Sequence, residues 1–313
     1  MKLLLLVNSS ASSVNARTRV IVQSKLAAEH SVTVAETSRR GHAARLARGA
    51  AHNGTECVVV LGGDGTLNET ANGLVGTDCA IAALPGGSTN VFARSLGLPH
   101  GPVEAVDVVL EALGRNAIRR VGLGKANDRY FVFHCGVGFD AAVVHEVERH
   151  NSVKRWAGHP LFAYSAVKTW VNGFDRPDHA HSIVADGADL TASTGPAFFT
   201  IVLNTAPYTY LGTRPFNVAP DASLDRPLAV VGFADMPITQ FLGAAASALG
   251  SGKKLRNHPK VVYRADMHDV ELSLVGEHPF PYQLDGDPVA EVRSLRVRWV
   301  PDCINVLDPR FRP

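Results

Sequence analysis

The chain has 313 residues, of which 46% are hydrophobic and 19% are charged, and its net charge at pH 7 is +2. Its length exceeds the usual size of a single hydrophobic core, so we expect two domains. The hydrophobic fraction excludes a disordered chain, and the weak net charge gives no reason to expect a nucleic-acid partner. The four cysteines are scattered and form no Cys-x-x-Cys pair, which predicts reduced thiols in a cytoplasmic protein without a disulfide framework.

Apolar runs in this sequence are short. The first, at residues 3–7, ends in Asn-Ser-Ser and lacks a small-residue cleavage site, so we interpret it as a buried strand and not as a signal peptide. Gly, Pro or charged residues interrupt every other run before it reaches the length of a membrane span. Any membrane contact is therefore expected to be peripheral.

The first part of the chain alternates apolar runs with helical patterns. Nearly continuous apolar or β-branched runs predict buried strands, and Ala, Leu and Val at helical spacing predict the helices between them. Strands that alternate with helices indicate a parallel, doubly wound sheet, which we expect to span residues 1–121. The predicted strands are 3–7, 31–35, 57–61 and 80–84, and the predicted helices are 17–28, 42–52, 90–96 and 103–113.

The pattern changes after about residue 114 to short strands separated by Asp-Gly, Asn-Asp and Asp-Arg-Pro turns. This predicts an antiparallel β-sandwich over residues 122–313, whose last residues pack back on the first domain. Two helices are expected within it, at 161–171 and 238–249. The predicted strands are 118–123, 130–133, 182–185, 198–203, 228–233, 261–265, 270–275 and 292–299.

A glycine-rich segment, Gly-Gly-Asp-Gly-Thr at residues 62–66, directly follows the third predicted strand. Glycines let the backbone turn sharply, and the amides of the turn and of the following helix then point at one locus that suits phosphate. Asp64 is informative because a carboxylate beside phosphates is repulsive unless it engages Mg²⁺ or a reacting hydroxyl. The alternative is a tight turn in which Asp64 only caps the helix.

A second segment of this kind, Gly-Gly-Ser-Thr-Asn at residues 86–90, follows the fourth predicted strand. Ligands of open α/β sheets bind outside the carboxyl ends of the strands, so both segments are expected to face one crevice. Asn8 and Thr37 follow the first two strands and are expected to line the same nucleotide pocket. The chain has no Gly-x-x-x-x-Gly-Lys-Ser/Thr motif and no protein-kinase motifs.

Asp285-Gly286-Asp287 places two carboxylates across one glycine near the end of the predicted β domain. By composition the triplet is typical of a hairpin turn. The functional alternative is a base that accepts a proton from an acceptor hydroxyl, since a kinase needs such a carboxylate.

Two stretches resemble the signatures of a known family. Residues 60–69, Val-Leu-Gly-Gly-Asp-Gly-Thr-Leu-Asn-Glu, and 84–94, Leu-Pro-Gly-Gly-Ser-Thr-Asn-Val-Phe-Ala-Arg, resemble those of the diacylglycerol kinase catalytic domain family. That family includes bacterial soluble lipid kinases and the sphingosine and ceramide kinases. Residues 133–140 are similar to its Gly-containing strand-to-helix segment, and the triplet at 285–287 stands where the family carries Asp-Gly-Glu.

This resemblance implies a phosphofructokinase-like α/β nucleotide-binding domain, a β-sandwich lipid domain and Mg²⁺-dependent transfer of the ATP γ-phosphate to a lipid hydroxyl. Diacylglycerol is the expected acceptor, giving phosphatidic acid. The implied catalytic residues are Asp285, Asp287 and Asp64. The implied ATP-binding residues are Asn8, Thr37, Gly62, Gly63, Gly65, Thr66, Asn68, Glu69 and Thr89.

The chain departs from the family pattern at two functional positions. Asp287 replaces Glu and is one methylene shorter, which makes Asp285 the preferred base. Bacterial members often carry Leu-Asp-Asp-Gly as a structural metal loop, whereas residues 224–227 read Leu-Asp-Arg-Pro. A guanidinium cannot ligate a cation, so Arg226 is expected to occupy the space of the metal, and no protein metal site is expected.

Two other functions stay open: an NAD kinase-like small-molecule kinase, which shares Gly-Gly-Asp-Gly-Thr, and a non-catalytic lipid or nucleotide sensor. A lipid kinase of this kind is expected in the cytoplasm and transiently at the inner face of the membrane, and a homodimer is compatible with the sequence. The aromatic and basic residues between 154 and 170 are typical of an interfacial helix, or equally of a helix packed on the sandwich.

Overall fold

The computed structural model describes residues 1–149 and 174–312. It separates into two compact units: Met1–Leu123 with Pro301–Pro313, and Gly124–Val300. The helix predicted at 161–171 and the aromatic and basic stretch at 154–170 lie outside the described residues. In the part of the chain that is described, no helix is long and apolar enough to cross a membrane.

A parallel sheet forms the centre of the first unit, as the alternating pattern predicts. Its strand order is β2-β1-β3-β4, and the end of β18 (Ser294–Leu307) pairs in parallel with β4 through Asn305 and Ala80. Every residue of β3 and β4 is buried, which explains their continuous apolar sequences. The strands are β1 (Lys2–Val7), β2 (Ser31–Glu36), β3 (Cys57–Gly62) and β4 (Ala80–Pro85).

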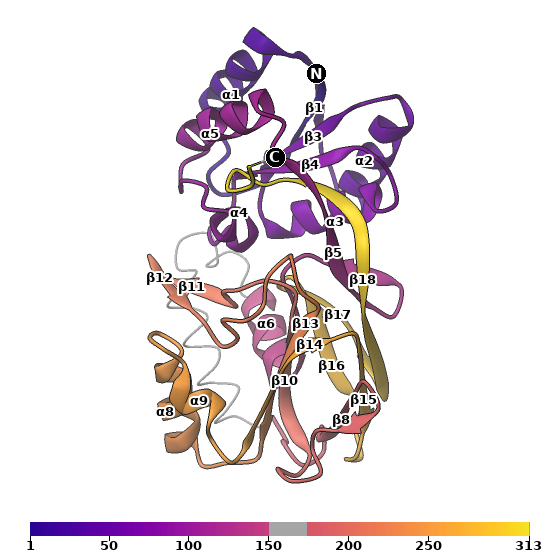
Figure 1. Ribbon diagram of the computed structural model, residues 1–313, viewed down its shortest axis with the longest axis vertical. Helices are drawn as coiled ribbons and strands as arrows, with labels where there is room; N and C mark the ends of the chain where they lie inside the picture. Colours follow the sequence, from indigo (N-terminus) through magenta and orange to yellow (C-terminus); the bar gives the residue numbers. More distant parts are fainter. Residues whose placement is uncertain (150–173, 313) are drawn as a thin grey trace. The chain divides into compact units, whose positions relative to one another are not determined.

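Helices cover both faces of this sheet. Figure 1 shows α1 and α5 on one side of the strands and α2 and α3 on the other, and each pair is in contact. The helix α5 begins at Pro102, whose fixed φ suits a first helical position. The predicted doubly wound arrangement is therefore confirmed. The helices are α1 (Ala16–Glu29), α2 (His42–His52), α3 (Asp64–Leu74), α4 (Val91–Ser95) and α5 (Pro102–Gly114).

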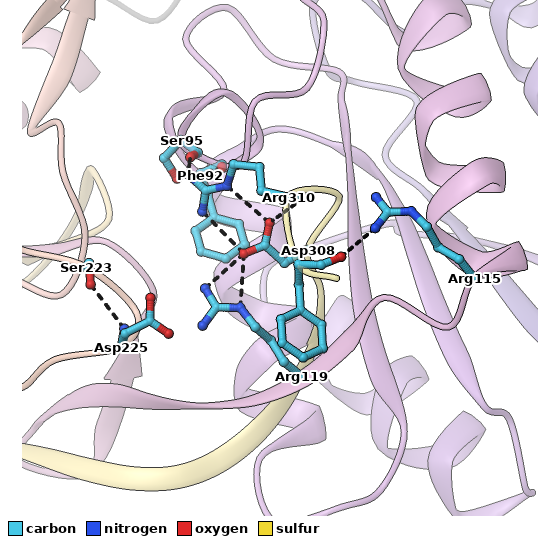
Figure 2. A network of polar contacts seen from close by, with 9 residues as sticks. Phe92, Ser95, Arg115, Arg119, Ser223, Asp225, Asp308 and Arg310 are labelled. Carbon is cyan, nitrogen blue, oxygen red and sulfur yellow. Dashed lines mark hydrogen bonds and ion pairs between the residues drawn. The ribbon is translucent and has the colours of Figure 1, made fainter. Parts of the chain in front are cut away.

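The C-terminal segment is tied to the first unit by a buried carboxylate, Asp308. Figure 2 shows Arg119 and Arg310 on either side of it, with Arg119 Nη2 2.9 Å from Asp308 Oδ2 and Arg310 Nε 3.2 Å from Asp308 Oδ1. Arg310 Nη1 also donates to the carbonyl oxygen of Ser95 over 2.6 Å. Burial raises the pKa of Asp308, but the hydrogen bonds and charges of Arg310 and Arg119 lower it overall. The segment is thus fixed by charge as well as by strand pairing.

Antiparallel strands make up most of the second unit, as predicted. One series of neighbours is β17-β16-β7-β10-β13-β14, and another is β8-β15-β18. The strands are β5 (Ile118–Ala126), β6 (Arg129–Phe131), β7 (His134–Gly138), β8 (His181–Ala185), β9 (Ala188–Asp189), β10 (Ala197–Leu203), β11 (Thr209–Leu211), β12 (Arg214–Phe216), β13 (Leu228–Ala234), β14 (Val261–Met267), β15 (Asp269–Leu274), β16 (Phe280–Leu284) and β17 (Asp287–Val292).

The central strands β10 and β13 are buried on both faces. Because side chains alternate along a strand, Val202 and Val230 pack into one core with Phe280, while Ile201 and Val231 pack into another. The second core also contains residues of α6 (Phe139–Arg149), α8 (Ile238–Ser247) and α9 (Lys253–Arg256). The predicted helix at 238–249 is confirmed as α8.

The short elements that were not predicted include β16, β17 and the hairpin of β11 and β12. The strand β16 contains Pro281, which has no backbone N–H to donate to a ladder. The structure pairs this strand with β17 on one side and β7 on the other. The hairpin strands have three residues each, which is too short for a visible alternation.

Candidate functional site

The glycine-rich segment at 62–66 forms the junction between β3 and α3. Gly62 is the last residue of β3, and Gly63 is the N-cap residue of α3 with extended backbone angles, φ −90° and ψ 179°. Gly63 has no side chain with which to cap the helix. The first amides of a helix have no partner within it, so this end of α3 can accept an anion such as a phosphate.

Hydrogen bonds hold three loops of the first unit together at this junction. Asn8 Nδ2 donates to Thr66 Oγ1 over 2.8 Å, which joins the end of β1 to the first turn of α3. The amide of Gly86 donates to the carbonyl oxygen of Gly62, and the amide of Ser13 donates to that of Gly86, each over 2.9 Å. The residues predicted at the ends of β1, β3 and β4 therefore do meet.

Glycine is required in the second segment because backbones approach closely there. A Cβ at Gly86 would lie 2.8 Å from the backbone nitrogen of Gly62, and a Cβ at Gly87 would lie 2.9 Å from the Cα of Gly63. These atoms are backbone and cannot move aside as a flexible side chain would. Asn90 closes the same loop from a left-handed conformation (φ 50°): its Oδ1 accepts from the amide of Gly87, and its Nδ2 donates to the carbonyl of Gly87.

Asp64 connects the two glycine-rich segments. Its carboxylate accepts from the amides of Val91 (3.0 Å) and Phe92 (3.3 Å), at the start of α4. The two segments were expected to present helix amides in the same way. The structure differs between the two segments. The amides at the start of α4 donate to the Asp64 carboxylate, whereas the N-cap residue of α3 is Gly63, which has no side chain to accept from that helix.

Other residues predicted to bind the nucleotide lie in different surroundings. The carboxylate of Glu69 accepts from the amides of Gly41 (2.7 Å) and Ala43 (3.2 Å), at the start of α2. Asn68 is fully buried within α3, where its carbonyl and Oδ1 accept from Asn72. Thr37 donates its amide to the carbonyl of Val7.

Gly65 and Thr89 lie where the segment pattern places them. Gly65 is in the first turn of α3, and Thr89 is a partly exposed residue of the 86–90 loop. Both are therefore within the elements that surround the α3 N-terminus.

In the second unit, Asp285 is buried and anchors a neighbouring loop. Its carboxylate accepts from the amides of Val132 (2.7 Å), Phe133 (2.9 Å) and His134 (3.0 Å). Its own backbone is left-handed, with φ 51°. A carboxylate engaged by three amides has little capacity left to accept a proton. This geometry indicates that Asp285 shapes the turn.

Asp287 is the more accessible carboxylate of the triplet. It begins β17, is partly exposed, and its Oδ2 lies 3.6 Å from Nη2 of Arg129. A nearby guanidinium orients a carboxylate without the tight geometry of three amide hydrogen bonds. Between the two acidic residues, the surroundings therefore favour Asp287 for contact with a ligand.

A buried polar chain runs behind this turn. Gln283 Oε1 accepts from the amide of Gly286 over 2.8 Å, and its Nε2 donates to Asp140 Oδ2 over 2.6 Å. The hydroxyl of Tyr208 donates to Asp140 Oδ1. Burial raises the pKa of Asp140, although both hydrogen bonds oppose the shift, and burial also raises the pKa of Tyr208. The sequence signal for Asp140 was the 133–140 segment, whereas Tyr208 stands in no motif.

Beside this chain lies an apolar cavity of about 300 Å³. It is enclosed by aromatic and aliphatic side chains from α6, β10, β13, α8 and the β11–β12 hairpin, including Phe139, Phe199, Phe216, Phe233, Phe241 and Leu242. Asp140 and Tyr208 are among its few polar residues. A cavity of this character suits a hydrocarbon chain.

No metal cluster of three His, Cys, Asp or Glu residues occurs among residues 1–149 and 174–312. At the position of the family's metal loop, Arg226 donates through Nε to Asp266 Oδ1 over 2.8 Å and through Nη2 to Asp266 Oδ2. The hydrogen bond from Arg226 lowers the pKa of Asp266. A guanidinium is thus the cation that this carboxylate binds, and the loop does not fit a metal ion.

Comparison with known proteins accounts for the two glycine-rich segments. Residues 2–126 match the diacylglycerol kinase catalytic domain. The match covers the first unit and the first residues of the second. The resemblance inferred from the two signatures is therefore confirmed, and the match supports a phosphotransferase.

Relatives match different shares of the chain. A protein of Chromohalobacter salexigens named probable lipid kinase YegS-like is 42% identical over 120 residues, which is 37% of this chain and 37% of that protein. The match thus spans little more than a third of that relative. A diacylglycerol kinase of Staphylococcus aureus is 26% identical over 254 residues, covering 77% of this chain and 74% of its own.

Solved structures support the fold over the full length. A crystal structure of a diacylglycerol kinase from Bacillus anthracis str. Sterne has a TM-score of 0.69 at 19% identity, covering 98% of this chain and 96% of that chain. A second structure from the same organism has a TM-score of 0.77 at 21% identity, with 98% and 95% coverage. At these identities the likeness shows the fold alone.

Proposed function

We propose that the protein is an ATP-dependent lipid kinase that transfers the γ-phosphate to a lipid hydroxyl, with diacylglycerol as the first candidate acceptor. The observation that carries this proposal is the family match over residues 2–126, whose signature residues form the α3 N-terminus. The apolar cavity of the second unit supports a lipid acceptor.

We propose the junction of β3 and α3 as the nucleotide site because its glycines leave room for phosphate groups. Gly63 supplies no capping side chain to the start of α3, and Gly86 and Gly87 allow the second loop to approach without a Cβ. Such a junction fits the phosphates of ATP. Asn8 and Thr66, which are hydrogen-bonded to each other, would keep the loops in place.

The residues of this junction could hold a divalent cation only together with a bound nucleotide, whose phosphates would supply most of the ligands. Since the described residues contain no cluster of three metal ligands, Mg²⁺ would be bound mainly by phosphate oxygens, with Asp64 as the nearest carboxylate of the junction. When bound there, the cation would neutralise charge on the transferred phosphoryl group.

On the acceptor side we propose Asp287 as the base, in place of the earlier preference for Asp285. The acceptor oxygen forms a bond to the γ-phosphorus, the bond from that phosphorus to the β–γ bridging oxygen breaks, and ADP leaves. The hydroxyl proton passes to Asp287. Asp285 would act as a positioning residue, because its carboxylate is engaged by three amides.

An NAD kinase-like activity is the second candidate, because Gly-Gly-Asp-Gly-Thr also occurs in that class. The cavity argues against it, since its apolar lining offers few hydrogen bonds to a dinucleotide. A sensor without catalysis is the third candidate. It would bind nucleotide without lipid-stimulated turnover.

The test is a kinase assay with radiolabelled ATP and Mg²⁺ against diacylglycerol, ceramide, sphingosine and monoacylglycerol in mixed micelles, with NAD as a soluble acceptor. We expect label in an organic-extractable phospholipid with diacylglycerol. Label only in NADP, or no transfer to any acceptor, would contradict the proposal. Asp287→Asn serves as the control that separates this activity from a contaminating kinase.

A further inference from the structure

The helix α8 carries an exposed apolar stripe. Ile238 and Leu242 stand at positions i and i+4, on one face of α8, and are 37% and 53% exposed. Leu249, which follows the end of the helix at Ser247, is the third residue of the stripe and is 39% exposed. The opposite face, with Ala244 and Ala248, is buried in the core. The helix is thus apolar both towards the protein and towards the solvent.

This stripe has no charged residue within it. The ten residues of α8 read Ile-Thr-Gln-Phe-Leu-Gly-Ala-Ala-Ala-Ser, whereas a surface helix normally presents charged residues on its outer face. Leu211 of the β11–β12 hairpin is a further exposed apolar residue, at 38%. Leu211 and Leu242 both line the apolar cavity, so the stripe is continuous with the rim of that cavity.

Positive charge lies directly beside the stripe. The helix α9 follows α8, contacts it, and presents Lys253 and Lys254 to the solvent. Between Met236 and Tyr263 the sequence contains four Lys or Arg residues and no Asp or Glu. An apolar stripe beside these cations is complementary to a surface that combines hydrocarbon with negative charge.

We propose that α8, α9 and the tip of the β11–β12 hairpin form a docking surface for an anionic lipid bilayer. The stripe would enter the boundary between head groups and acyl chains, and Lys253 and Lys254 would contact lipid phosphates. A lipid acceptor could then pass from the bilayer to the cavity along Leu211 and Leu242. This last step rests on the proposed kinase function, whereas the docking itself does not.

The test measures sedimentation of the full-length protein with vesicles that contain no kinase substrate. Vesicles of phosphatidylcholine alone are compared with vesicles that include 30% phosphatidylglycerol, at low and high salt. We expect binding to the anionic vesicles, weakened by salt. We expect the Ile238→Gln/Leu249→Gln variant to bind at least tenfold more weakly, and Lys253→Gln and Lys254→Gln to lose about fivefold each.

The matched control is Val275→Gln, which changes an apolar residue of the same unit that is 56% exposed and lies outside α8, α9 and the hairpin. It should bind vesicles as the unmodified protein does. Unchanged vesicle binding in the Ile238→Gln/Leu249→Gln variant would overturn the proposal. A second outcome would also overturn it: the unmodified protein binds no vesicles, sediments as a dimer, and becomes a monomer in this variant. The stripe would then be the contact between two copies of the chain.

A kinase assay with dioctanoylglycerol in detergent micelles separates the two proposals. Ile238 and Leu249 do not line the cavity, so their substitution should leave this activity unchanged. Vesicle binding that the stripe variant weakens, without any kinase activity, would refute the proposed kinase function and support the proposed docking surface. Kinase activity together with vesicle binding that no stripe variant weakens would refute the surface alone.

Discussion

Gln283 donates a hydrogen bond from Nε2 to Oδ2 of the buried Asp140 over 2.6 Å. Its Oε1 accepts from the amide of Gly286, so a single neutral side chain connects the acidic turn to the polar edge of the apolar cavity. Because the amide group both donates and accepts, this one side chain satisfies both partners.

Gln283→Glu should make stability depend on pH. The new carboxylate would lie beside Asp140, whose pKa burial already raises, so one of the two must stay protonated in the folded state. A folded-state pKa raised above the unfolded value means that stability is lost as pH rises. Chemical unfolding at pH 5 and pH 8 should show a loss of about 2–4 kcal/mol at the higher pH. Gln283→Met, which adds no charge, should lose a similar amount at both values.

Asp285→Asn should mainly lower stability, whereas Asp287→Asn should mainly lower turnover. Asp285→Asn replaces an acceptor of three amide hydrogen bonds, so we expect a loss of about 2–4 kcal/mol in unfolding free energy. Asp287→Asn changes a partly exposed group and should leave stability within about 0.5 kcal/mol. It should lower kcat by about 100-fold or more. Normal turnover in folded Asp287→Asn would remove it as the base.

Asp64→Asn should affect both stability and turnover. The new amide group would face the Val91 or Phe92 amide, so we expect a loss of about 1–3 kcal/mol in thermal or chemical unfolding. Turnover should fall by about 100-fold or more if Asp64 acts on Mg²⁺ or the acceptor. Glu69→Gln is the matched change on the same helix, and it should lose similar stability but retain most turnover. Equal activity in both variants would assign Asp64 to structure alone.

Gly87→Ala should disrupt the nucleotide junction, whereas Gly49→Ala should not. An added Cβ at Gly87 would lie 2.9 Å from the Cα of Gly63, while one at Gly49 on α2 meets no atom within 4 Å. We expect nucleotide affinity, measured by calorimetry, to fall at least tenfold for Gly87→Ala. Gly49→Ala should bind normally and be stabilised by about 0.5–1 kcal/mol. Undiminished affinity in Gly87→Ala would separate this loop from the nucleotide.

Acid should destabilise the second unit through two buried histidines. Burial lowers the pKa of His134 to about 3 and that of His181 to about 4. Both rings are neutral when folded but take up protons near pH 6.5 when unfolded, so stability is complete above that value and is lost as pH falls. Each ring should contribute a slope of about 1.4 kcal/mol per pH unit between its two pKa values.

His134→Phe isolates one of these slopes. It retains an aromatic ring against Phe133 and Tyr208, and among the described residues His134 Nδ1 has no hydrogen-bond partner to lose. Denaturant titrations from pH 7 to pH 4 should therefore show a flatter loss of stability in the variant. An unchanged slope would exclude His134 as a source of the acid sensitivity.

The sequence by itself determined the parallel sheet, the glycine-rich segments and the resemblance of residues 2–126 to the diacylglycerol kinase catalytic domain. A buried parallel strand needs a continuous apolar run, and a strand-to-helix junction near a phosphate needs glycine, so 57–61 and 62–66 carry these constraints in adjacent residues. Local chemistry of this kind can be detected without knowing the rest of the fold.

Only the tertiary structure decided what the carboxylates do. Asp64, Asp285 and Glu69 all accept from amides of other elements, at separations of 26 to 153 residues. Tyr208 and Gln283 reach Asp140 from 68 and 143 residues away. A hydrogen bond depends on the positions that chain packing gives to its two partners, and no spacing within a motif records that.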